Sequence, residues 1–194
     1  MAQLTVSDTI DRPAALAPSA WFAKICWLMA GLSLAGAFLN LLAPILVFLF
    51  PAQASQFNLS LGHLGAPLTD KVPLDDRLLA LGCQLVPAAI ASFGLVALAR
   101  LFRLFAKGSV FSRGAMRALN QVALALFAND IAAIVVQLPT SYFLSHFNPP
   151  GHRILSLGLG TDDLEGLFLA GAVLVIASVM AEARRIAADH AEIV

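Results

Sequence analysis

The chain has 194 residues, of which 59% are hydrophobic and 12% are charged, and its formal net charge is zero. Soluble domains average about 45–50% apolar and about 25% charged residues, so a water-soluble fold does not account for this composition. The zero net charge gives no basis for binding nucleic acid or an acidic partner through bulk charge. The composition indicates a protein that is surrounded by lipid.

The chain begins with a segment rich in Ala and Pro, residues 1–20, which we expect to be a flexible tail ahead of one membrane domain at 21–194. The first apolar run, 25–50, has no charged residue and exceeds the about 20 residues that a membrane-spanning helix needs. The following Ala52-Gln53-Ala54 resembles a signal-peptide cleavage site, but a signal peptide has an apolar core of only about 7–15 residues. We therefore predict an uncleaved span at about 23–50.

Three further apolar runs follow. The run at 78–99 has no charged residue, the run at 118–138 has only Asp130, and the run at 166–181 reaches spanning length when extended to 164–183. The corresponding spans are predicted at about 78–105, 115–138 and 163–185. The predicted fold is an all-α integral membrane protein with four transmembrane helices, arranged as a four-helix bundle.

Lys and Arg residues concentrate on one side of the predicted spans. Nine of them lie there: Arg12, Lys24, Arg100, Arg103, Lys107, Arg113, Arg117, Arg184 and Arg185. Only three lie on the other side: Lys71, Arg77 and Arg153. Short loops rich in Lys and Arg remain in the cytoplasm, so we expect both termini and the middle loop to be cytoplasmic.

The middle loop carries five of these charges, and they are candidate lipid- or partner-binding residues. Arg100, Arg103 and Lys107 recur on one helical face, and Arg113 and Arg117 are one turn apart. Each basic residue near an anionic membrane surface gains about 1 kcal/mol of attraction. Three interpretations remain open: the charges only fix the topology, they bind anionic lipid headgroups, or they dock another membrane or cytoplasmic protein.

Between these charges lies the sequence Gly108-Ser109-Val110-Phe111-Ser112. Gly108 fits the left-handed residue that ends a helix, and Ser112 fits the N-cap of the next one. Phe111 precedes this N-cap and can form a hydrophobic staple with Met116. The sequence therefore predicts a compact turn between two helices.

This turn resembles the G-x-x-F-S/T motif of a bacterial family, domain of unknown function 2975, whose members are small proteins with four predicted spans. Ala181-Glu182-Ala183-Arg184-Arg185 and Glu192-Ile193-Val194 are similar to the family's C-terminal tail, from which Asp189-His190 departs. The resemblance covers the chain from about Trp21 to its end. It implies a bacterial inner-membrane location and, because members are often encoded beside small helix-turn-helix regulators, a regulatory role. It implies no catalytic residue.

Asp130 is the only charged residue within the third run, about 18 Å from its start at about 1.5 Å per residue. A carboxylate near the middle of the bilayer costs about 2.5–3.5 kcal/mol, so Asp130 should face neighbouring helices. The candidate intramembrane polar site comprises Asp130, Asn129, Gln84 and Asn40, which lie at similar depth. Pro87 and Pro44 leave the carbonyls of Cys83 and Asn40 free as further partners. Hydrogen bonding between helices, contact with another subunit, and a proton or ion relay remain alternative roles.

Three short sequences recur in the same order. They are Leu59-Ser60-Leu61-Gly62 with Leu155-Ser156-Leu157-Gly158, Asp75-Asp76 with Asp162-Asp163, and Ile90-Ala91-Ser92 with Ile176-Ala177-Ser178. Chance is one explanation, since Leu, Gly and Ala are abundant. The alternative is an internal duplication, which predicts two helical hairpins related as parallel repeats.

No pattern in the sequence indicates an enzyme. The two cysteines, Cys26 and Cys83, lie at depths too different for the about 7 Å limit of a disulfide. His63, His146 and His152 fall in loops without metal-ligand spacing. We therefore expect a non-catalytic protein with no cofactor, no metal and no direct contact with nucleic acid.

The working hypothesis is a protein that regulates or binds a partner through its basic middle loop and its C-terminal tail. One alternative is a small transporter or channel that uses Asp130. A further alternative is an accessory subunit of a larger membrane complex, in which Asn40 and Asp130 would point outward from the helices.

Overall fold

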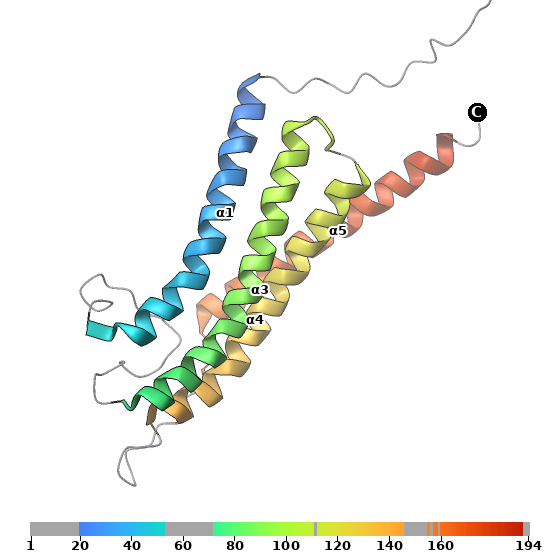
Figure 1. The fold of residues 1–194 in the computed structure, drawn as a ribbon. Helices are drawn as coiled ribbons and strands as arrows, with labels where there is room; N and C mark the ends of the chain where they lie inside the picture. Colours follow the sequence, from blue (N-terminus) through green and yellow to red (C-terminus); the bar gives the residue numbers. More distant parts are fainter. Residues whose placement is uncertain are drawn as a thin grey trace, which may run out of the picture.

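The computed structural model describes residues 20–52, 72–110, 112–145, 155, 157–158 and 160–191, with the side chains of 162–163 and 184–191 excepted. These residues form the helices α1 (Ala20–Leu49), α3 (Leu74–Ala106), α4 (Arg113–Ser145) and α5 (Thr161–Ala191), shown in Figure 1. Each helix is long and apolar enough to cross a membrane, and the described ranges contain no strand. The predicted all-α fold with four such helices is confirmed for this part of the chain.

The outward surfaces of these helices are apolar, as lipid contact requires. Phe38 on α1 is 67% exposed and Phe168 on α5 is 80% exposed. Large apolar patches of this kind are unfavourable in water but match hydrocarbon. The helices therefore indicate a multi-pass membrane protein in contact with lipid.

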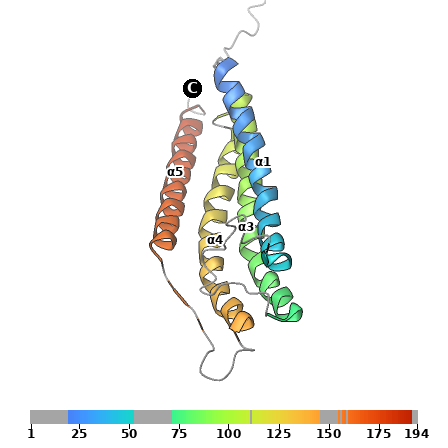
Figure 2. The same ribbon diagram turned by 90° about the vertical axis from the view of Figure 1, so that its left-hand side faces the viewer.

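The helices pack in chain order as an open row. Within the described residues α1 contacts α3, α3 contacts α4, and α4 contacts α5, with no other pair of helices in contact. Figure 2 shows α5 beside α4 on the side away from α1. The predicted four-helix bundle is therefore wrong, because the helices do not enclose a common core.

The hydrocarbon that surrounds the helices gives a physical reason why they form an open row. Hydrocarbon is as apolar as a leucine side chain, so no hydrophobic force drives the outer helices to close on each other. Each outer helix has one stripe of small buried residues facing a single neighbour. On α1 this stripe comprises Cys26, Ala30, Ser33 and Ala37, and on α5 it comprises Ala170 and Ala177.

One end of the row gathers the basic residues. The start of α1, the turn between α3 and α4, and the end of α5 lie at this end (Figures 1 and 2). At the opposite end the fully buried Phe48 packs in a cluster with Leu81 and Leu144. Pro44 and Pro87 lie inside α1 and α3, and both helices bend in the halves that contain them (Figure 1).

The described part of the proposed duplication shows one shared feature and one difference. Asp75-Asp76 and Asp162-Asp163 both start one residue after the beginning of their helices, α3 and α5. Ser92, however, donates a hydrogen bond to the carbonyl of Ala37 on α1, whereas the exposed Ser178 donates to its own helix. The repeat at residues 59–62 lies outside the described residues, and the duplication stays a prediction.

Candidate functional site

The basic turn, residues 100–117, joins α3 to α4 through a capped bend. Gly108 follows α3 with a φ of 74°, a left-handed conformation that glycine adopts without strain. The N–H of Ser109 donates to the carbonyl of Leu104 (3.0 Å), and the N–H of Gly108 donates to the carbonyl of Phe105 (2.9 Å). These two hydrogen bonds form a Schellman motif, as the sequence predicts for Gly108.

Ser112 caps the start of α4 on the other side of the bend. Its Oγ accepts a hydrogen bond from the N–H of Ala115 (3.1 Å), which is the predicted N-cap interaction. The predicted staple cannot be placed, because Phe111 lies outside the described residues. With both helix ends capped within a few residues, the backbone that carries the flanking basic side chains has a defined conformation.

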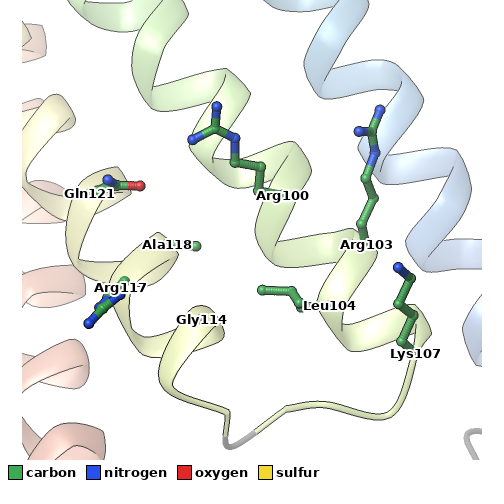
Figure 3. A pocket seen from close by; sticks show the side chains of 8 residues that line it. All are labelled: Arg100, Arg103, Leu104, Lys107, Gly114, Arg117, Ala118 and Gln121. Carbon is green, nitrogen blue, oxygen red and sulfur yellow. The ribbon is translucent and has the colours of Figure 1, made fainter.

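A hollow of about 420 Å³ lies between α3 and α4 beside this bend. It is lined by four basic residues, one amide and three apolar residues: Arg100, Arg103, Lys107, Arg117, Gln121, Leu104, Gly114 and Ala118 (Figure 3). In Figure 3 Arg100 leans toward Gln121 of α4, whereas Arg103 and Lys107 project from the side of α3 away from α4. No acidic residue lines the hollow.

The structure thus brings together four of the five basic residues that the sequence singles out. The fifth, Arg113, is exposed beside the hollow but does not line it. All five side chains are exposed, and none is paired with an acidic side chain in the ranges that the structure describes. The mutual repulsion of these cations is therefore uncompensated within those ranges, which favours binding of an anion.

The hollow lies where hydrocarbon gives way to the membrane surface. The uncharged run of α3 ends at residue 99, directly before Arg100, and the apolar run of α4 begins at Ala118, directly after Arg117. Both helices have 33 residues and are about 50 Å long at about 1.5 Å per residue, longer than a hydrocarbon core of about 30 Å. Their ends project beyond the core, and the basic residues lie on the projecting part.

The candidate intramembrane polar residues are distributed over three helix interfaces. Between α1 and α3, Asn40 Nδ2 donates to the carbonyl of Ala88 (2.9 Å) and to Ser92 Oγ (3.2 Å). The Ser92 hydroxyl in turn donates to the carbonyl of Ala37 (3.0 Å). Between α3 and α4, Gln84 Nε2 makes a long contact of 3.5 Å with Oγ1 of the buried Thr140. These residues therefore join helices rather than converging on one site.

Asp130 lies at the third interface, between α4 and α5. A Cβ placed on Gly166 of α5 would lie 2.9 Å from Oδ2 of Asp130, so the carboxylate packs directly on this glycine. Asn129 Nδ2 lies 3.4 Å from Oδ1 of Asp130 as a donor. Of the candidate partners at this depth, Asn129 contacts Asp130, whose carboxylate packs against α5.

These orientations bear on the accessory-subunit alternative. That alternative predicts Asn40 and Asp130 pointing outward, but Asn40 bonds to α3 and Asp130 packs on α5.

Gln137, which was not identified from the sequence, is 5% exposed and accepts a hydrogen bond from the N–H of Gly158 (2.9 Å). The sequence signal that could have identified Gln137 is the presence of an amide side chain near the end of the apolar run at 118–138.

The remaining chemistry-bearing residues form no site among the described residues. Cys26 is buried, Cys83 is partly buried, and both are free thiols. Within the described residues, no group of three or more His, Cys, Asp or Glu side chains could hold a metal ion. His63, His146 and His152 lie outside the described residues.

Comparison with known proteins identifies a family. The family model for a protein of unknown function, DUF2975, matches residues 52–194, which include α3, α4 and α5. The match begins after α1, so it is shorter than the resemblance from about Trp21 that the sequence suggests. No curated protein and no solved structure matches significantly. The family model covers most of the chain and confirms the resemblance: this protein belongs to the DUF2975 family of proteins of unknown function.

Proposed function

We propose that this protein is a non-catalytic protein of the bacterial inner membrane that regulates or assembles with a partner protein. The basic turn binds an acidic surface of that partner on the cytoplasmic side. The observation that carries this proposal is the set of five exposed basic residues on a capped bend, unpaired within the described ranges.

The charge distribution supports the orientation. Nine of the twelve Lys and Arg residues fall in the N-terminal segment, the middle loop and the C-terminal segment of the sequence, and short segments rich in Lys and Arg remain in the cytoplasm. Both termini then lie in the same compartment as the basic turn. Reporter fusions at residue 1, at the basic turn and at residue 194 test this orientation. A terminus found in the opposite compartment from the turn contradicts it.

The partner-binding part of the turn is its tip. Lys107 is the C-cap of α3 and Arg113 is the first residue of α4, so both lie farther from the hydrocarbon than Arg100 and Arg117. The caps at Gly108 and Ser112 fix their separation before the partner arrives. Binding then orders little additional backbone, which is the general advantage of a preorganised surface.

Copurification tests the proposal. Full-length protein, crosslinked in cells and then extracted in mild detergent, is compared with a Lys107→Gln/Arg113→Gln variant. The control is Arg12→Gln/Lys24→Gln, which removes the same charge from the N-terminal segment. We expect one partner with an acidic surface to copurify with the wild type and the control, to be lost from the tip variant, and to dissociate as salt is raised. Equal recovery from all three proteins, or no partner from the wild type, contradicts the proposal.

A further inference from the structure

We propose that the hollow between α3 and α4 binds the phosphate group of an anionic phospholipid. The phosphate lies between Arg100 of α3 and Gln121 of α4, and Arg117, whose side chain points away from α3 in Figure 3, turns toward the phosphate when the lipid binds. The acyl chains lie against the exposed apolar faces of the two helices beneath. The residues proposed to bind the phosphate differ from those of the partner-binding tip, Lys107 and Arg113, although Lys107 also lines the hollow.

The chemistry of the lining matches a phosphodiester. Three of the lining residues are arginines, whose planar guanidinium groups donate paired hydrogen bonds to phosphate oxygens. Gln121 adds an amide donor, and no carboxylate lines the hollow to repel an anion. The volume of about 420 Å³ lies within the range of about 300–1,000 Å³ that is typical of small-molecule sites.

The position of the hollow matches the depth of a lipid headgroup. Arg100 directly follows the uncharged run of α3, and Arg117 directly precedes the apolar run of α4. Basic pockets between membrane helices at this level bind the headgroups of anionic lipids. A soluble anion would meet the same residues, but only a lipid also extends toward the hydrocarbon.

An apolar surface for acyl chains continues below the hollow. Phe93 precedes Arg100 by seven residues and Leu124 follows Arg117 by seven, so each lies about two turns deeper on the same face of its helix. Phe93 is 53% exposed and Leu124 is 56% exposed. Ala128, seven residues beyond Gln121, is a small apolar residue at the corresponding depth of α4.

A second hollow lies on the opposite side of the α3–α4 helix pair and differs from the first in its lining. This second hollow of about 240 Å³ is lined by residues of the same two helices, including Ala91, Gly94 and Leu98. Each of these precedes Arg100, Arg103 or Lys107 by nine residues, about two and a half turns, and therefore lies on the opposite face of α3. Asn129 is the only polar residue that lines this second hollow. Because the second hollow has no basic residue in its lining, we expect an anionic lipid to bind the first hollow and not the second.

Lipid binding by the full-length protein tests this proposal. Delipidated protein is mixed with dioleoyl phosphatidylglycerol or dioleoyl phosphatidylcholine, and bound lipid is counted by native mass spectrometry. We expect phosphatidylglycerol to be retained preferentially, and its affinity to fall about 25-fold in Arg100→Gln/Arg117→Gln, at about fivefold for each basic residue. The Arg12→Gln/Lys24→Gln control removes the same charge and should retain the wild-type affinity.

Further measurements distinguish a lipid from a soluble anion or a protein as the bound molecule. Equal affinity in the wild type and the Arg100→Gln/Arg117→Gln variant overturns the site, as does an equal loss in the control. If inorganic phosphate alone displaces the bound lipid completely, the hollow binds a soluble anion. If polyglutamate binds the hollow and phosphatidylglycerol does not, the hollow binds a protein surface. Either result overturns the lipid assignment.

A second measurement uses the wild type and does not depend on any variant folding. Phosphatidylglycerol with a photoreactive acyl chain should crosslink to the segments around Phe93 and Leu124, and crosslinks confined to other segments overturn the proposal. Because the partner assay uses Lys107 and Arg113, failure of lipid binding with a retained partner affects this proposal alone.

Discussion

The carboxylate of Asp130 on α4 rests directly on Gly166 of α5. A Cβ at residue 166 would lie 2.9 Å from Oδ2, 3.1 Å from Cγ and 3.2 Å from Oδ1 of Asp130, closer than ordinary van der Waals contact. Because Gly166 has no side chain, it leaves space for the Asp130 carboxylate to contact α5.

We expect Gly166→Ala to weaken the contact between α4 and α5. The added methyl group displaces the Asp130 carboxylate, and overpacking of this kind costs about 1–3 kcal/mol. The value should lie near the lower limit, since the Asp130 side chain can rotate. Unfolding in detergent, followed by circular dichroism, measures the change.

A double-mutant cycle identifies the cause. In an Asp130→Ala background the space is vacant, so Gly166→Ala should cost little there. Gly171→Ala on the same helix is the matched control, because no atom lies within 4 Å of its added Cβ. An equal cost of Gly166→Ala in both backgrounds would show that the contact with Asp130 is not responsible.

The contact between α3 and α4 depends on a second close approach, at Gly94. A Cβ at this position would lie 2.8 Å from Cβ of Ala125. We expect Gly94→Ala to cost about 1–3 kcal/mol of stability, because small residues let membrane helices approach closely. The reciprocal exchange, Gly94→Ala with Ala125→Gly, should restore most of the loss in the same unfolding assay. Gly82→Ala on α3, where no atom lies within 4 Å, should be neutral.

The sequence predicted the helices and the bend because both depend on local signals. Uncharged runs of spanning length define α1 and α3 regardless of what they contact. Gly108 and Ser112 satisfy the helix ends with backbone and side-chain groups a few residues away. Neither feature requires knowledge of the neighbouring helices.

The neighbours themselves could not be predicted in the same way. In a soluble helix one apolar stripe reveals the buried face, but α1 and α5 expose apolar residues on their lipid-facing sides as well. Periodicity therefore did not show that Asp130 faces α5 or that the row stays open. The small residues Gly166, Ala170 and Ala177 on α5 were a usable signal, because they lie close to one face of the helix.

The α1–α3 interface gives a prediction about hydrogen bonding in the membrane. Ser92 accepts from Asn40 Nδ2 and donates to the carbonyl of Ala37, so Ser92→Ala removes two interhelical hydrogen bonds. We expect a loss of about 0.6–1.7 kcal/mol in thermal unfolding, the range for such bonds in lipid. The matched control is Ser178→Ala, whose hydroxyl is exposed and bonds only to the Leu174 carbonyl of its own helix. Equal losses from both substitutions would refute the interhelical role.

The bend of the basic turn gives a prediction about backbone conformation. Gly108→Ala places a Cβ on a residue with a φ of 74°, which costs roughly 1–2 kcal/mol for an L-residue. We expect faster amide exchange at Ser109, whose N–H bonds to Leu104. Gly108→Asn should have a smaller effect, because Asn tolerates this conformation better. Gly114→Ala is the matched control, since its Cβ would make no contact closer than 3.4 Å.

The transport alternative makes the opposite prediction from ours at Asp130. Within the described residues the carboxylate has Asn129 as its hydrogen-bond neighbour and packs on Gly166, an arrangement that joins helices. The amide in Asp130→Asn has nearly the same volume and keeps the contact with α5. We therefore expect this variant to fold normally and to leave the proton and ion flux of reconstituted vesicles at the wild-type level. A wild-type flux above that of empty vesicles that disappears in Asp130→Asn would instead establish Asp130 as a relay residue.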